Sequence, residues 1–127
     1  MIGGKVLDAS ALAELARQRP AAFAWLRTAR VLGIALYLPA FALAEVRAVR
    51  PDAAPLLADL LTHPSVLVGE LDAAMAEQVD RLLLEANAFD ALAGHVIHVA
   101  WQRRWPVLTA DPGRLHRIDP AVDVDLL

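Results

Sequence analysis

Short apolar segments of the β type alternate with longer segments of helical periodicity along most of this chain. Such alternation is typical of parallel strands that are joined by helical crossovers. We therefore predict an α/β fold, a three-layer α/β/α sandwich with a central parallel sheet of four or five strands. The predicted strands are residues 5–7, 34–38, 66–68 and 107–109, with a short fifth strand within 122–126.

The size and composition fit one folded domain. The chain has 127 residues, 57% of them hydrophobic, so we predict a single domain over residues 1–127. So apolar a chain can offset the entropy of ordering, which excludes a disordered protein. The longest apolar stretch, residues 31–44, is shorter than the ~20 residues of a membrane-spanning helix. Because a signal-peptide pattern is also missing, we expect a cytoplasmic protein with no membrane segment.

Four acidic residues occupy positions where a ligand commonly binds or where a carboxylate is costly. Asp8 and Asp111 follow predicted strands, and the carboxyl ends of parallel strands line the ligand crevice of such folds. Glu45 shares a helix face with apolar residues, where a charge needs a partner. Asp90 begins the most buried of the predicted helices, 91–101. A simpler explanation of these positions is that Asp8 and Asp90 cap helices and that Asp111 holds a turn.

Taken together, the four acids favour a cation site. Several carboxylates at one crevice repel one another and must bind protons or share a cation. The chain contains no cysteine, which excludes thiolate ligands and thiol nucleophiles. Ligation by oxygen alone selects hard cations, so we predict Mg²⁺ or Mn²⁺. Arg114, beside Asp111, is expected to contact a phosphate, whereas His95 and His98 are expected to be core or subunit-interface residues.

Four short motifs give the chain a resemblance to the PIN domain family, and its length resembles that of the stand-alone bacterial toxins of the VapC type. An apolar strand followed by Asp-x-Ser resembles the first motif, and a strand closing in Thr-x-Asp resembles the last. Between them lie an Ala-Glu-Val triplet and an Asp followed by small residues. In order, these segments are residues 6–12, 44–46, 90–93 and 107–111.

This resemblance implies a metal-dependent endoribonuclease that cleaves single-stranded or structured-loop RNA as the toxin of a type II toxin–antitoxin pair. It implies a cognate antitoxin as partner, and we also expect a homodimer. Ser10 and Thr109 become hydroxyls that support the acids. The catalytic and metal-binding residues implied by the resemblance are Asp8, Glu45, Asp90 and Asp111.

The chain departs from the family pattern at one place. Many members carry a further acid a few residues beyond Thr-x-Asp, whereas here Pro112, Gly113 and Arg114 follow. This departure leaves the number of metal ions open. It also keeps open a second function, a catalytically silent RNA- or protein-binding module of the same fold.

Two phosphotransfer classes that also gather acids at strand ends fit poorly. A dehalogenase-type phosphatase needs Asp-x-Asp after its first strand, but here Ser10 occupies the position of the second acid. A receiver domain needs a lysine near its last strand, and Lys5 is the only lysine in the chain. The net charge of −3 is low for a protein that binds nucleic acid. We therefore expect RNA binding to require the divalent cation, which reverses the local charge of the acids.

Overall fold

The computed structural model describes residues 3–127, and within them it has five strands that alternate with helices. The predicted α/β fold is confirmed. The strands are β1 (Gly4–Leu7), β2 (Ala35–Pro39), β3 (Val66–Gly69), β4 (Val107–Thr109) and β5 (Val124–Leu126). The helices are α1 (Ala9–Ala16), α2 (Pro20–Leu32), α3 (Ala40–Val49), the 3₁₀ turn η1 (Pro51–Ala53), α4 (Ala54–Leu61), α5 (Ala73–Ala86), α6 (Ala91–Arg103) and α7 (Pro112–His116).

The strands pair in parallel in the order β3-β2-β1-β4-β5, which places β1 at the centre of the sheet. The chain adds β2 and β3 on one side of β1 and then returns to add β4 and β5 on the other side. The order of the strands therefore reverses between β1 and β4. In open parallel sheets, ligands bind outside the carboxyl ends of the strands at such a reversal point. The segments that follow Leu7 and Thr109 lie at this point.

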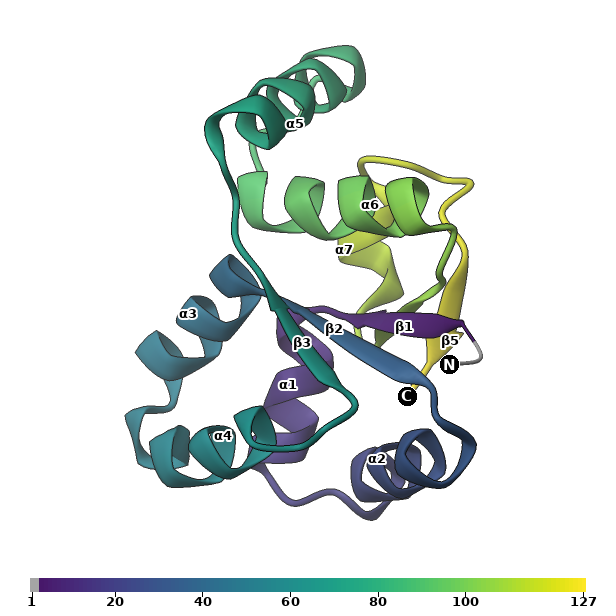
Figure 1. Ribbon diagram of the computed structural model, residues 1–127. Coiled ribbons are helices and arrows are strands. Elements are labelled where there is room, and N and C mark those ends of the chain that lie inside the picture. The colour runs from purple at the N-terminus through teal and green to yellow at the C-terminus, as the bar shows by residue number, and fades with distance from the viewer. Residues whose placement is uncertain (1–2) are drawn as a thin grey trace.

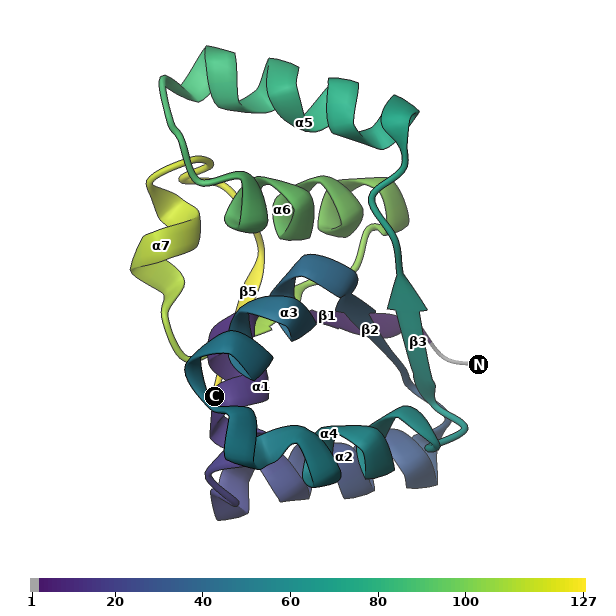
Figure 2. The same cartoon turned by 90° about the vertical axis from the view of Figure 1, so that its left-hand side faces the viewer.

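Helices cover both faces of the sheet and complete the three layers (Figures 1 and 2). Helices α1 to α4 lie on one side, and α6 and α7 lie on the other. Helix α5 packs on α6 and lies on its far side from the sheet (Figure 2). The sheet thus separates two cores.

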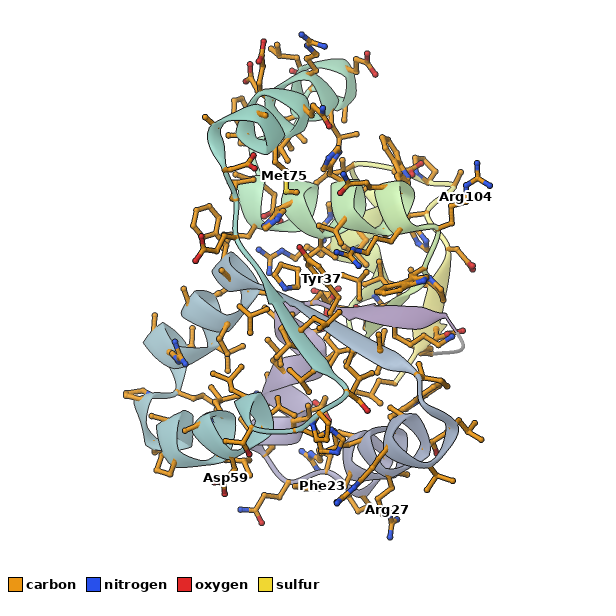
Figure 3. All side chains as sticks on the ribbon, viewed as in Figure 1. Phe23, Arg27, Tyr37, Asp59, Met75 and Arg104 are labelled. Atoms are coloured by element: carbon orange, nitrogen blue, oxygen red, sulfur yellow. The ribbon has the colours of Figure 1, made fainter. Side chains whose placement is uncertain are left out.

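The two cores are apolar and tightly buried. Leu38 of β2 and Leu57 of α4 belong to the core beneath α1 to α4. Tyr37 points the other way and joins the core under α6, as Figure 3 shows. His95 is also fully buried in α6, which confirms the expectation of a core histidine.

Local signals in the sequence explain where most helices begin and end. Asp72 caps α5 by accepting a hydrogen bond from the amide of Met75, and Gly33 ends α2 in the left-handed conformation that favours glycine. Two polar residues near helix starts, Ser10 and Asp52, do not act as caps. Ser10 does not cap α1, because Asp8 already accepts the amide of Ala11. Residue 52 does not cap α4 either, because the chain enters that helix through the 3₁₀ turn η1.

Within residues 3–127, no helix combines the length and the apolar character that are needed to cross a membrane.

Strand β2, which pairs with the central strand β1, allows a test of the packing. Leu38 is fully buried, so Leu38→Ala removes apolar contacts and leaves a cavity between the sheet and the helices. We expect the free energy of unfolding to fall by about 2–5 kcal/mol in urea denaturation. Leu84, on α5, is 72% exposed and serves as the control, with an expected change of about 0.5 kcal/mol or less for Leu84→Ala. Equal losses in the two variants would contradict this description of the core.

Candidate active site

A buried carboxylate lies at the end of the central strand. Asp8 is only 5% exposed and follows β1 directly. Its Oδ1 accepts hydrogen bonds from the hydroxyl of Ser10 at 2.6 Å and from the amide of Ala11 at 2.9 Å. Its Oδ2 accepts from the hydroxyl of Thr109, at the end of β4, at 2.5 Å. One side chain thus joins β1, the first turn of α1 and β4.

The two hydroxyls are themselves held in place by the backbone after β4. Ser10 Oγ accepts the amide of Ala110, and Thr109 Oγ1 accepts the amide of Asp111, each at 2.9 Å. Each hydroxyl oxygen accepts through a lone pair, and its proton is donated to Asp8. Both hydroxyls therefore contact Asp8, and their role in supporting a metal site stays a prediction.

Burial and hydrogen bonding act in opposite directions on Asp8. Burial is the largest effect and raises the pKa of this carboxyl above its ordinary value, because it disfavours the charged form. The hydrogen bonds from Ser10, Thr109 and Ala11 and the charge of Arg114 lower the pKa, but they do not cancel the effect of burial.

A second pair of carboxylates is joined by an arginine. Arg114 Nε and Nη2 donate to Asp90 Oδ2 and Oδ1 at 2.6 and 2.9 Å. Arg114 Nη1 and Nη2 donate to Glu45 Oε2 and Oε1 at 2.7 and 2.9 Å. The guanidinium is therefore bidentate to both carboxylates, the strongest geometry for such a pair. These contacts lower the pKa of Asp90 and raise that of Arg114, so both pairs of hydrogen bonds favour the charged forms of these two groups.

The fourth acid takes part differently. Asp111 is the N-cap of α7, and its Oδ1 accepts the amide of Arg114 at 3.3 Å. Asp90 likewise caps α6 by accepting the amide of Ala93 at 3.1 Å. The simpler explanation of Asp90 as a helix cap is therefore correct, and it coexists with the pairing to Arg114. Asp111, which was expected to hold a turn, caps α7 instead.

The structure brings the predicted site residues to one end of the sheet, but not into one metal cluster. Asp8 and Arg114 share the lining of a cavity of only about 10 Å³, roughly the room of one water molecule. Across residues 3–127, no three side chains of the metal-binding types are arranged so that they could hold an ion. Arg114 instead occupies the position between Glu45 and Asp90. The four-carboxylate metal site stays a prediction.

The donor chemistry at this end of the sheet nevertheless suits a hard divalent cation. Glu45 and Asp90 offer only carboxylate oxygens, which Mg²⁺ and Mn²⁺ prefer. A cationic group already lies between these two carboxylates, the guanidinium of Arg114. The chemistry of these two carboxylates therefore suits a cation, and in this structure the guanidinium of Arg114 is the cation that they bind.

The bridging contacts of Arg114 were not foreseen from the sequence, which predicted a phosphate contact. The available signal was Glu45, whose position on an apolar helix face required a partner of opposite charge. Glu45 is 69 residues away from Arg114, and no local pattern connects residues at that separation.

The hydroxyl of Thr109 can be tested by Thr109→Val. Thr109 is fully buried, and the variant leaves Asp8 Oδ2 and the amide of Asp111 without this partner. We expect the free energy of unfolding, measured in urea at pH 7, to fall by about 1–3 kcal/mol, which is the cost of unpaired buried polar groups. Thr109→Ser keeps the hydroxyl and is the matched control with the smaller loss. A valine variant as stable as the serine variant would be inconsistent with these hydrogen bonds.

The raised pKa of Asp8 predicts how stability depends on pH. In acid the Asp8 carboxyl is neutral in both the folded and the unfolded chain. When the pH rises above the pKa of the unfolded chain, the carboxyl ionises there first, and this favours unfolding. The loss of stability is complete once the pH exceeds the higher pKa of the folded protein. Asp8→Asn removes this loss while its amide can still donate to Thr109 Oγ1. In EDTA, we expect the variant to match the natural protein below pH 3.8 and to be more stable at pH 7, by urea denaturation. The free energy of unfolding of the variant, minus that of the natural protein, should rise from pH 3.5 to pH 7. A fall in this difference would contradict the prediction.

Comparison with solved structures places the fold among known proteins. VapBC2 from Rickettsia felis, solved bound to a DNA fragment from its promoter, matches with a TM-score of 0.70 and 13% identity over 100% of this chain and 99% of the other. FitAcB from Neisseria gonorrhoeae matches with a TM-score of 0.58 and 23% identity over 94% of each chain. The sequence matches no protein-family model and no curated protein.

These comparisons correct the resemblance drawn from the four motifs. The assignment to the PIN family and to its VapC-type toxins is wrong as a statement of membership, because no family model matches the chain. At 13 and 23% identity, the likeness to the solved structures extends to the fold alone. The chain is a three-layer α/β/α sandwich of PIN-like architecture.

Proposed function

We propose that this chain is a Mg²⁺- or Mn²⁺-dependent endoribonuclease and the toxin of a type II toxin–antitoxin pair, acting in the cytoplasm. The observation that carries the proposal is the gathering of Asp8, Glu45 and Asp90 around one cationic group at the reversal point of the sheet. The structures that share the fold, VapBC2 and FitAcB, are toxin–antitoxin complexes, which supports the cellular context.

The acids have distinct tasks in this proposal. Asp8, Glu45, Asp90 and Asp111 would hold one or two divalent cations, and Glu45 could also orient the nucleophilic water. When bound, the cation supplies a water of lowered pKa and neutralises the charge that develops on the scissile phosphate. Hydrolysis of this kind leaves 5′-phosphate and 3′-hydroxyl ends.

The hydroxyls next to Asp8 act on its orientation. Ser10 and Thr109 each donate to one oxygen of the carboxylate, so the group cannot rotate freely. Groups that orient a metal ligand in this way commonly affect metal affinity and activity. Because the backbone after β4 fixes both hydroxyls, the position of Asp8 depends on the same segment that carries Asp111.

The proposed partners are an RNA substrate, a cognate antitoxin and a second copy of the chain. A toxic ribonuclease must be held inactive until it is needed, which is the task of the antitoxin. Exposed apolar side chains offer surface for protein contacts, among them Val31 (81% exposed), Val49 (75%) and Phe89 (97%). We assign none of them to one partner.

The activity is tested with the Asp8→Asn variant, whose fold we expect to be at least as stable as the natural one at pH 7. With a single-stranded RNA and Mn²⁺, we expect cleavage to fall roughly 100-fold or more, since even supporting residues of metal sites contribute about 10–100-fold. EDTA should abolish cleavage by the natural protein, and added Mn²⁺ should restore it, with 5′-phosphate ends on the products.

The control is Asp80→Asn, because Asp80 is an exposed acid on α5, away from the β1 and β4 ends. This variant should cleave RNA at the natural rate. Undiminished metal-dependent cleavage by Asp8→Asn would refute the assignment of the site.

One observation favours a second candidate function, a catalytically silent RNA- or protein-binding module. Arg114 satisfies Glu45 and Asp90 without any metal. A silent module would bind RNA or protein equally well in EDTA and in Mn²⁺ and would cleave no RNA in either.

A further inference from the structure

The contacts of Arg114 are unusually complete for a side chain near the surface. Its three nitrogens make four hydrogen bonds to Glu45 and Asp90, all between 2.6 and 2.9 Å. The three side chains are 26–33% exposed, so solvent reaches them but does not surround them. Glu45 lies in α3, Asp90 is the N-cap of α6 and Arg114 lies in α7, so the guanidinium joins these three helices.

Arg114 and a divalent cation compete for the same oxygens. Both oxygens of Glu45 and both oxygens of Asp90 accept from the guanidinium. A cation that binds these two carboxylates needs the same lone pairs, and it repels a guanidinium that stays in place. The adjoining cavity beside Asp8 has room for about one water molecule, so both cations do not fit there together.

The guanidinium can leave without unfolding α7. The backbone amide of Arg114 donates to Asp111 Oδ1, so the start of the helix is held by a contact that does not involve the side chain. Rotation of the Arg114 side chain alone would free Glu45 and Asp90. The released guanidinium would remain at the mouth of the site with its five donors free.

We propose that Arg114 is a built-in competitor of the divalent cation: metal binding at Glu45 and Asp90 displaces its guanidinium, which then becomes the group that binds the phosphate of the RNA. This inference rests on the proposed function and deepens it. The metal-free state of the protein is then a closed one, in which Glu45 and Asp90 are paired with an arginine of the same chain. It also gives Arg114 two successive partners of the same charge, first carboxylates and then a phosphate.

The first test measures the binding of Mn²⁺ alone, without RNA, by isothermal titration calorimetry. Arg114→Met removes the charge and keeps much of the length of the side chain. If the closed state holds about 90–99% of the natural protein, the variant should bind Mn²⁺ roughly 10- to 100-fold more tightly. Arg114→Lys keeps the charge but cannot form both bidentate contacts, so its affinity should lie between the two.

The control is Arg81→Met, which removes an exposed arginine that pairs with Glu77 on α5. It should leave Mn²⁺ affinity unchanged. An arginine that merely ties the helices together would give the opposite result for Arg114→Met, with weaker or equal Mn²⁺ binding. Either of these results, or the lack of any Mn²⁺ binding by both proteins, would overturn the proposal.

The second test uses the natural protein and does not depend on whether a variant folds. In the ¹⁵N NMR spectrum of the natural protein, titration with Mg²⁺ should shift the Nε–Hε signal of Arg114, since Nε leaves Asp90. The Nε–Hε signal of Arg81 should stay in place. An Arg114 signal that is unmoved at saturating Mg²⁺ would show that the guanidinium remains on the carboxylates, and the proposal would fail.

The outcomes separate this inference from the proposed function. Displacement of Arg114 by Mg²⁺ without any RNA cleavage would uphold the competition and refute the nuclease. Metal-dependent cleavage with an unmoved Arg114 signal would do the reverse.

Discussion

The buried carboxylate of Asp8 is the interaction on which the rest of the site depends. It stands where the central strand ends and where the order of the sheet reverses, and its two oxygens tie β1 to α1 and to β4. Burial makes its charge costly, so Ser10 and Thr109 have to be placed to donate to it. A carboxylate that costs stability in the folded protein, and that is nevertheless held so firmly, is typical of a functional site.

Much of the fold could be predicted because its signals are local. Apolar runs between glycine, proline and acidic residues mark the strands, and the predicted bounds of β4 agree with those of the structure. Asp72 and Gly33 mark helix ends through contacts within four residues of themselves. Where two residues competed for one local role, as Asp8 and Ser10 did for the cap of α1, the sequence did not decide between them. Geometry did so, because the carboxylate of Asp8 reaches the amide of Ala11.

The residues of the candidate site could be predicted, but the contacts between them could not. Asp8, Glu45 and Asp90 were identified because strand ends and helix faces make their positions unusual. The pairing of Glu45 and Asp90 with Arg114 spans 69 and 24 residues and arises only when α3, α6 and α7 meet. A charged residue on an apolar helix face indicates that a partner of opposite charge is needed. Which residue becomes that partner is decided only when the chain folds. The same applies to the family: four short motifs describe where acids lie, and the comparisons support the fold only.

The charge of the protein gives the arginine bridge its significance. The net charge is −3, but without Asp8, Glu45, Asp90 and Asp111 the remaining 11 acids nearly balance the 12 basic residues. The repulsion of a phosphate backbone is therefore concentrated at the site that would have to bind it. Arg114 offsets only part of that charge, and it does so with donors that are all turned inward onto carboxylates. A divalent cation would add two positive charges and turn those donors outward. The affinity of the site for RNA should therefore change in one step with metal binding.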